Sequence, residues 1–218
     1  IGMRGPGETQ LETDRRLLGQ RVKVLSKRLE KLRQQRETGR QRRAEIPVPS
    51  LALVGYTNAG KSTLFRALTG ELSTYIADQL FATLDPLVRR VALPGGTPVG
   101  VADTVGFIRE LPHELLAAFH STLTEAREAT LLLHVVDASD PRRDERIEQV
   151  NKVLIEVGAG DLPQILVFNK IDRLEVAAAL ERNDAAVPQR VWVSAARGDG
   201  LPLLVQAAAE RLSRFSQH

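Results

Sequence analysis

The chain has 218 residues, of which 43% are hydrophobic and 26% are charged, and its formal net charge is +3. It has no cysteine, which excludes disulfides and thiolate metal sites. No apolar run approaches the length of a membrane span and no secretory signal is visible, so we expect a cytoplasmic protein without stable membrane insertion.

Residues 1–45 are expected to form a glycine-rich loop and a long basic helical arm. Residues 15–43 contain 12 Lys or Arg and two Glu, a net charge of +10, whereas residues 44–218 sum to −5. Apolar residues at heptad spacing predict one narrow seam along the helix: Leu11, Leu18, Val22, Leu25, Leu29 and Leu32. The seam could dock on the same molecule. Alternatively, the arm could neutralise a nucleic-acid backbone, since it has no aromatic residue with which to read bases.

Residues 46–49 are interpreted as a proline-containing linker to a domain over 50–218. That domain begins with an apolar strand, and Gly55–Ser62 then reads G-Y-T-N-A-G-K-S before a helical segment. A strand, this spacing of glycines and Lys-Ser, and a helix are typical of a phosphate-binding loop. Lys61 would place a cation against the phosphates, and Ser62 would offer a hydroxyl to Mg²⁺. We expect a nucleoside triphosphate to contact Gly55, Tyr56, Thr57, Asn58, Ala59, Gly60, Lys61, Ser62 and Thr63.

Two further segments are expected around the triphosphate. Thr83, in a loop after the first helix, would be the second protein ligand of Mg²⁺. A strand then delivers Asp103 to the magnesium shell, through a water, and places the Gly106 amide near the γ-phosphate. Lys61, Thr83 and Gly106 are thus the expected catalytic residues. The contacts assigned to these two segments are Phe81, Ala82, Thr83, Leu84, Asp85, Asp103, Thr104, Val105 and Gly106.

The base is indicated by Asn169-Lys170-Ile171-Asp172, which follows a buried strand. A carboxylate at Asp172 can accept hydrogen bonds from the ring N–H and the exocyclic amine of guanine, and adenine has no matching donor pair. Asn169 would tie this loop to the phosphate loop, and the stem of Lys170 would lie over the base. Ser194, Ala195 and Ala196 follow another strand, where their backbone could cap the guanine oxygen. GTP or GDP is therefore the expected ligand.

Two positions bear on hydrolysis. Phe107 follows the glycine of D-x-x-G, where many small GTPases have the glutamine that orients the attacking water. A phenyl ring cannot accept a hydrogen bond from water, so we expect slow intrinsic hydrolysis. The alternative is that Phe107 only packs the switch. Asn58 could help to hold K⁺ near the β/γ bridge, or it could simply brace the loop.

The predicted fold is an α/β three-layer sandwich of the P-loop NTPase type, with a mostly parallel six-stranded sheet. Leu93–Pro98 looks like a hairpin turn, which makes one strand antiparallel. We expect strands near 50–54, 87–93, 98–103, 131–137, 164–169 and 190–193, and helices near 61–69, 113–128, 144–157, 174–182 and 201–213.

Four segments closely resemble the HflX family of ribosome-associated GTPases: Gly5–Arg16, Gly55–Ser62, Phe81–Pro86 and Asp103–Ile108. The first of them, G-P-G-E-T-Q-L-E-T-D-R-R, is much more specific than any GTPase motif. The resemblance implies a cytoplasmic, magnesium-dependent GTPase that binds the large ribosomal subunit and its rRNA, with no DNA partner. It also implies a role in splitting or rescuing stalled ribosomes under stress. We expect residues 1–45 to be the end of the family's N-terminal domain.

Two other readings stay open from the residues alone. The chain could be a GTP-dependent switch that barely hydrolyses, which Phe107 favours. It could also be a maturation GTPase that acts on free RNA through the basic arm.

Overall fold

The computed structural model describes residues 48–70, 87–94, 96–104, 106 and 126–215. Their strands are β1 (Ser50–Val54), β2 (Leu87–Ala92), β3 (Pro98–Asp103), β4 (Leu131–Asp137), β5 (Gln164–Asn169), β6 (Ala179–Arg182) and β7 (Pro188–Trp192). Their helices are α2 (Lys61–Thr69), α4 (Arg143–Glu156) and α5 (Leu201–Phe215), with a short 3-10 helix, η1 (Ile171–Arg173).

The strands form one sheet in the order β2-β3-β1-β4-β5-β7-β6. The five central strands run parallel, and β2 and β6 are antiparallel edge strands. The carboxyl ends of the parallel strands therefore meet at one edge of the sheet. The register shows this directly, since Leu53 pairs with Asp103 and Asp137 pairs with Asn169. Ligands in open α/β sheets bind at this edge.

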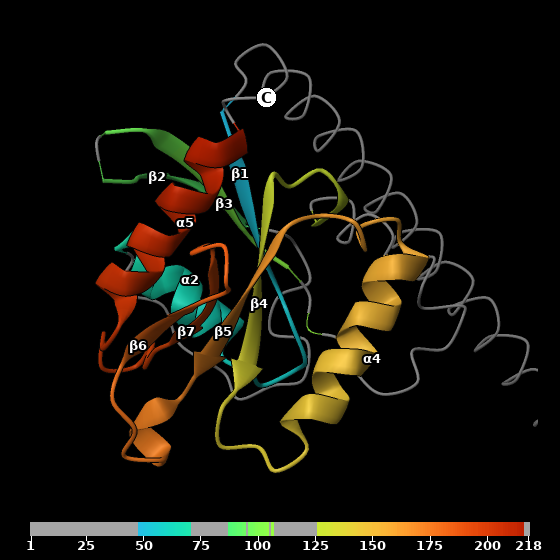
Figure 1. The fold of residues 1–218 in the computed structure, drawn as a ribbon, viewed down its shortest axis with the longest axis vertical. Coiled ribbons are helices and arrows are strands. Elements are labelled where there is room, and N and C mark those ends of the chain that lie inside the picture. The colour runs from blue at the N-terminus through green and yellow to red at the C-terminus, as the bar shows by residue number, and fades with distance from the viewer. Residues whose placement is uncertain (1–47, 71–86, 95, 105, 107–125, 216–218) are drawn as a thin grey trace, which may run out of the picture. The chain divides into compact units, whose positions relative to one another are not determined.

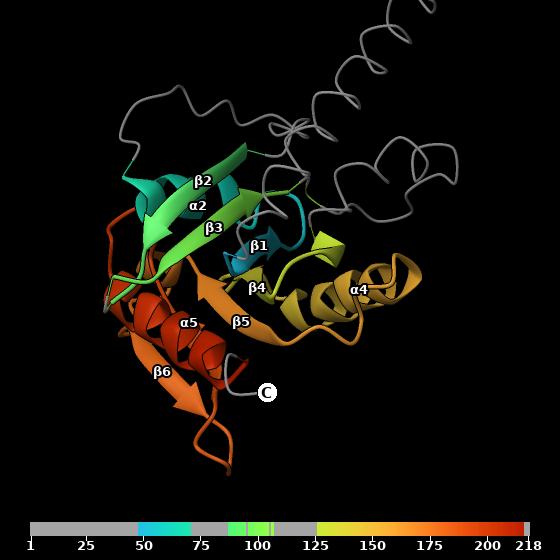
Figure 2. The same cartoon turned by 90° about the horizontal axis from the view of Figure 1, so that it is seen from above.

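Helices cover both faces of the sheet, which gives the three layers (Figures 1 and 2). Successive residues of a strand point to opposite faces, and β1 separates the two cores in this way. Leu51 and Leu53 pack in a cluster with residues of α2 and α5, whereas Ala52 and Val54 pack in a second cluster with residues of α4. The fold expected from the sequence, a mostly parallel P-loop sandwich, is confirmed.

The expectation of six strands and a helix over 174–182 was wrong. The end of this segment forms an additional strand, β6, which pairs antiparallel with β7 and brings the sheet of the described residues to seven strands. Asn183 makes the turn between them: its Oδ1 accepts the N–H groups of Ala185 and Val187 at 3.1 and 2.9 Å. Arg182 also forms an ion pair with Glu210 of α5, at 2.5 Å. Residues 174–182 are rich in good helix formers, but the hairpin and its tertiary contacts override that local propensity.

The other expected elements that lie in the described residues are confirmed within two residues at their ends. The strand expected at 190–193 begins earlier, at Pro188, because it pairs with β6. The helix expected over 113–128 lies mostly outside the described residues, as do the basic arm and the domain boundary at 45. None of the helices that the structure describes is both long and apolar enough to cross a membrane.

Candidate functional site

The loop between β1 and α2 is held in its shape by two glycines with positive φ. Gly55 has φ 147°, and a Cβ built there would lie 2.2 Å from the carbonyl oxygen of Val135 on β4. Gly60 has φ 94°, and a Cβ there would lie 2.3 Å from Nδ2 of Asn169. Only glycine fits either position, because both the backbone conformation and the space exclude a side chain. The loop therefore packs closely on β4 and on the residue that ends β5.

Lys61 is the first residue of α2, and its side chain folds back over the loop. Its Nζ donates to the carbonyl oxygens of Gly55 at 3.1 Å and Tyr56 at 2.9 Å. The residue is only 6% exposed, and burial lowers the pKa of Lys61 to about 8, an effect that the Asp103 carboxylate opposes. A buried ammonium of this kind gains strongly from an anion brought close to it.

The end of β3 lies beside the same loop. Asp103 is 1% exposed, and a Cβ on Gly106 would lie 2.9 Å from both Lys61 Nζ and Thr57 Cα. D-x-x-G thus meets the loop closely, as its expected role requires. Thr104, an expected nucleotide contact, is buried, and its hydroxyl donates to the carbonyl oxygen of Leu53 at 2.6 Å. It anchors β3 to β1.

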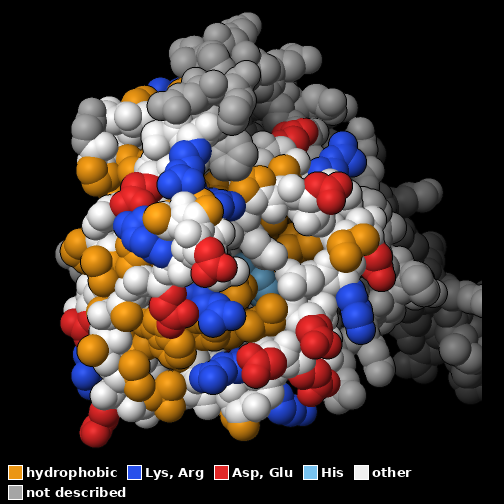
Figure 3. Space-filling view, in the orientation of Figure 1, with side chains coloured by type: hydrophobic (Ala, Val, Ile, Leu, Met, Phe, Trp, Pro, Cys, Tyr) orange, Lys and Arg blue, Asp and Glu red, His pale blue; other side chains and the backbone are white. Residues whose placement is uncertain are grey.

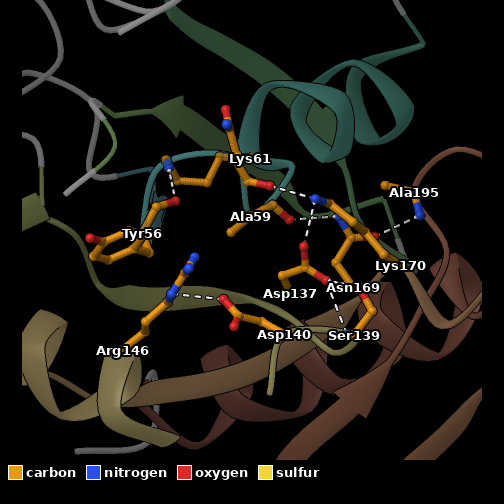
Figure 4. A network of polar contacts seen from close by, with 11 residues as sticks. Tyr56, Ala59, Lys61, Asp137, Ser139, Asp140, Arg146, Asn169, Lys170 and Ala195 are labelled. Carbon is orange, nitrogen blue, oxygen red and sulfur yellow. Dashed lines mark hydrogen bonds and ion pairs between the residues drawn. The ribbon is translucent and has the colours of Figure 1, made fainter. Parts of the chain in front are cut away.

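Asn169 joins three loops at the end of β5 (Figure 4). Its Nδ2 donates to the carbonyl oxygen of Ala59 at 3.0 Å, and its Oδ1 accepts the N–H of Ala195 at 2.9 Å. The side chain is 2% exposed, so both bonds are made away from water. The sequence predicts the first of these contacts but not the second.

The loop after β7 closes on Asp172. Ser194 is fully buried, and its hydroxyl donates to Oδ1 of Asp172 at 2.5 Å. This bond fixes the carboxylate that is expected to meet guanine. Because the N–H of Ala195 already bonds to Asn169, a guanine oxygen would need another N–H of this loop, such as that of Ala196, or would have to displace that bond.

Asp137, at the end of β4, is a residue of this site that sequence reasoning missed. Its Oδ2 accepts from Nζ of Lys170 at 2.7 Å, and the same ammonium donates to the carbonyl oxygen of Asn58 at 2.6 Å. Burial would raise the pKa of Asp137, but the bonds from Lys170 and Ser139 outweigh it and hold that pKa below its ordinary value. Lys170 therefore bridges Asp137 and the phosphate loop. The signal was available, since Asp137 ends the central strand between two motif-bearing strands.

The segment containing Thr83 (Phe81, Ala82, Thr83, Leu84 and Asp85), together with Val105 and Phe107, lies outside the described residues. The described residues contain no cluster of three or more His, Asp or Glu side chains that could hold a metal ion. A magnesium ion bound with a triphosphate does not need one, because it takes one or two protein oxygens and completes its shell with phosphates and water. The hydroxyl of Ser62 and the buried carboxylate of Asp103 are oxygen donors of this kind.

Comparison with known proteins gives two family matches. Residues 50–170, more than half of the chain, match the family described as 50S ribosome-binding GTPase. Residues 1–43 match the family described as GTP-binding GTPase Middle Region.

Curated relatives match over the whole chain. A protein called GTPase HflX from Escherichia coli (strain K12) is 57% identical over 100% of this chain and 51% of its own length. GTPase HflX from Caldanaerobacter subterraneus subsp. tengcongensis is 50% identical over 100% of this chain and 49% of its own length. The chain thus spans about half the length of these relatives.

A solved structure shares the fold. It is a GTP-binding protein from the hyperthermophilic archaeon Sulfolobus solfataricus in complex with GDP, 25% identical, with a TM-score of 0.60. The match covers 84% of this chain and 58% of that protein.

Proposed function

Because the chain belongs to the 50S ribosome-binding GTPase family, and within it to the HflX GTPases, we propose that the carboxyl edge of its sheet binds GTP with Mg²⁺ and hydrolyses it in response to the large ribosomal subunit. The nucleotide site is supported above all by the two hydrogen bonds of Asn169, which join the phosphate loop to the loop after β7 at 3.0 and 2.9 Å. A triphosphate would lie along one side of this junction and a guanine base along the other.

Lys61 is the group that responds to the phosphates. Its ammonium donates to two carbonyl oxygens of its own loop, 3.1 and 2.9 Å away, and would exchange these neutral partners for the β- and γ-phosphate oxygens. Gly106 lies against this ammonium, so its N–H would meet the γ-phosphate from the other side. When bound, Mg²⁺ would neutralise charge that develops on the phosphates. Ser62, Thr83 and, through water, Asp103 would hold it.

The test of this site is Lys61→Ala. We expect it to abolish tight GTP binding in equilibrium titrations, because the loop loses its only cation directed at the phosphates. An unchanged dissociation constant would overturn the phosphate-loop assignment.

The proposed partner is the large ribosomal subunit and its rRNA, contacted through the basic arm, in splitting or rescue of stalled cytoplasmic ribosomes. The description of the matching family, 50S ribosome-binding GTPase, supports the subunit as partner, and the net charge of +10 in residues 15–43 supports contact with RNA phosphates. The face of the described domain seen in Figure 3 mixes acidic and basic side chains and carries no comparable basic field.

Steady-state GTP turnover with and without purified large subunits, at fixed ionic strength, tests the partner. We expect a large stimulation, and we expect neutralisation of Arg28, Lys31 and Arg33 to weaken subunit binding and flatten its salt dependence without changing GTP affinity. Equal turnover with and without subunits would contradict the proposal.

A second candidate is a GTP-dependent switch in RNA or ribosome maturation with little hydrolysis of its own. Phe107 favours it, because it stands where a water-orienting glutamine would be expected. Preference for naked RNA over assembled subunits would support this candidate.

We also propose that K⁺ binds beside Asn58, which lies exposed on the loop with φ 60°. Turnover in KCl and in NaCl should then differ at equal ionic strength. Equal rates would leave Asn58 as a brace of the loop.

A further inference from the structure

A side chain of α4 that belongs to none of the nucleotide-binding motifs contacts the phosphate loop. Arg146, near the start of α4, lies over the ring of Tyr56, with its Cζ 4.4 Å from the ring centroid. Its Nε is 2.7 Å from Oδ2 of Asp140, a carboxylate in the loop between β4 and α4 that is only 9% exposed. Figure 4 shows the three side chains side by side beneath the phosphate loop.

The contact is built to hold Tyr56 in place. A guanidinium over an aromatic face is attracted by the ring, more strongly where water is partly excluded. Tyr56, Asp140 and Arg146 line a small pocket together with Ala59 and His134, so the contact is made in a partly enclosed space. The ion pair with Asp140 restrains the orientation of the guanidinium, so a movement of Tyr56 away from it would lose the contact.

Tyr56 in turn connects to the reactive end of the loop. Its carbonyl oxygen accepts from Nζ of Lys61 at 2.9 Å. The same turn of α4 also contacts the guanine side, since Arg143 lies over the ring of Phe168 at 5.9 Å and donates to the carbonyl oxygen of Ala138 at 3.2 Å. Phe168 immediately precedes Asn169. The first turn of α4 therefore contacts the strand and the loop that carry both halves of the candidate site.

We propose that Arg146 is a positioning residue for the nucleotide: fixed by Asp140, it holds the Tyr56 ring and so keeps the phosphate loop in the shape that receives phosphates. The inference rests on the proposed function, in which Gly55–Ser62 binds the phosphates. It adds a residue outside every nucleotide-binding motif of the chain.

The experiment compares GDP dissociation constants for the protein and for Arg146→Ala, Arg146→Lys, Tyr56→Leu and the double variant Arg146→Ala/Tyr56→Leu. We expect Arg146→Ala to weaken GDP binding about tenfold, which corresponds to about 1.4 kcal/mol and lies in the range of a partly desolvated cation–π contact. The double variant should bind no more weakly than Tyr56→Leu alone, because the arginine acts through the ring. Arg146→Lys keeps a cation and should recover part of the loss.

Two controls separate positioning from general damage. Lys152→Ala removes an exposed cation from the same helix and should leave GDP affinity at the parent value. The ratio of GDP to XDP affinity should stay unchanged in Arg146→Ala, because base selection is assigned to Asp172. A fall in that ratio together with affinity would indicate a damaged fold and overturn the proposal.

Two further outcomes distinguish this inference from the function on which it rests. Parent-like GDP affinity in Arg146→Ala, or additive losses in the double variant, with Lys61→Ala still abolishing binding, would overturn this inference alone. Absence of GDP binding by the parent protein would overturn both.

Discussion

Replacing Asn169 by alanine removes a side chain that bonds the phosphate loop to the loop after β7. Two buried bonds are lost, from Asn169 Nδ2 to the Ala59 carbonyl at 3.0 Å and from the Ala195 N–H to Asn169 Oδ1 at 2.9 Å. Ala59 and Ala195 are 2% and 7% exposed, so water cannot readily replace the lost partners. Each buried group left unsatisfied costs about 1–3 kcal/mol, so the expected loss of unfolding free energy is about 4 kcal/mol.

Urea unfolding without nucleotide measures this loss, and a GDP titration measures the accompanying loss of affinity. Asn151→Ala is a matched control, because Asn151 lies on α4 and accepts only one long bond, from Gln164 at 3.5 Å. We expect it to change stability by about 0.5 kcal/mol, because one long bond between neutral groups lies at the weak end of the hydrogen-bond range. If Asn169→Ala were as stable as Asn151→Ala and bound GDP as tightly as the parent, the role given to this junction would be refuted.

Three further predictions concern β4 and the glycine that packs against it. Gly55→Ala should lower stability by more than about 2 kcal/mol and impair GDP binding, because its Cβ would meet the backbone of β4 at 2.2 Å. Gly96→Ala is the control: Gly96 also has a positive φ, but its Cβ would meet open space, so the substitution should cost about 1 kcal/mol. Burial lowers the pKa of His134 to about 4, so below pH 6.5 the unfolded chain binds a proton that the folded chain does not. Stability should therefore fall by about 2 kcal/mol between pH 8 and pH 5. In His134→Gln, the urea midpoint should lack this part of the pH dependence. Asp137→Asn should weaken GDP binding about threefold, because it replaces the charged partner of the Lys170 ammonium by a neutral one. An unchanged GDP titration would contradict the bridging role of Lys170.

The motifs predicted where most residues of the candidate site lie, because each motif is a short stretch whose chemistry requires particular residue types. Gly55, Gly60 and Lys61 are of this kind, and their φ angles and contacts follow from one loop. Asp137 and Arg146 could not be assigned in the same way, since their roles arise from pairing between β4, β5, α4 and the phosphate loop, and no local pattern marks such contacts. The β6 hairpin was mistaken for a helix for a related reason. The alanine-rich stretch before Arg182 favours a helix locally, while the Asn183 turn and the Arg182–Glu210 ion pair decide the outcome through tertiary contacts.

Selection of guanine at this edge of the sheet is assigned to Asp172. Its carboxylate is fixed by Ser194 at 2.5 Å, and an asparagine could accept the same hydroxyl, so Asp172→Asn should fold normally. The direct measurement is the affinity of the protein and of Asp172→Asn for GDP and XDP. We expect the protein to prefer GDP and the variant to prefer XDP, because the extra carbonyl of xanthine accepts the hydrogen bond that the carboxamide donates. An unchanged preference for GDP in Asp172→Asn would contradict this assignment.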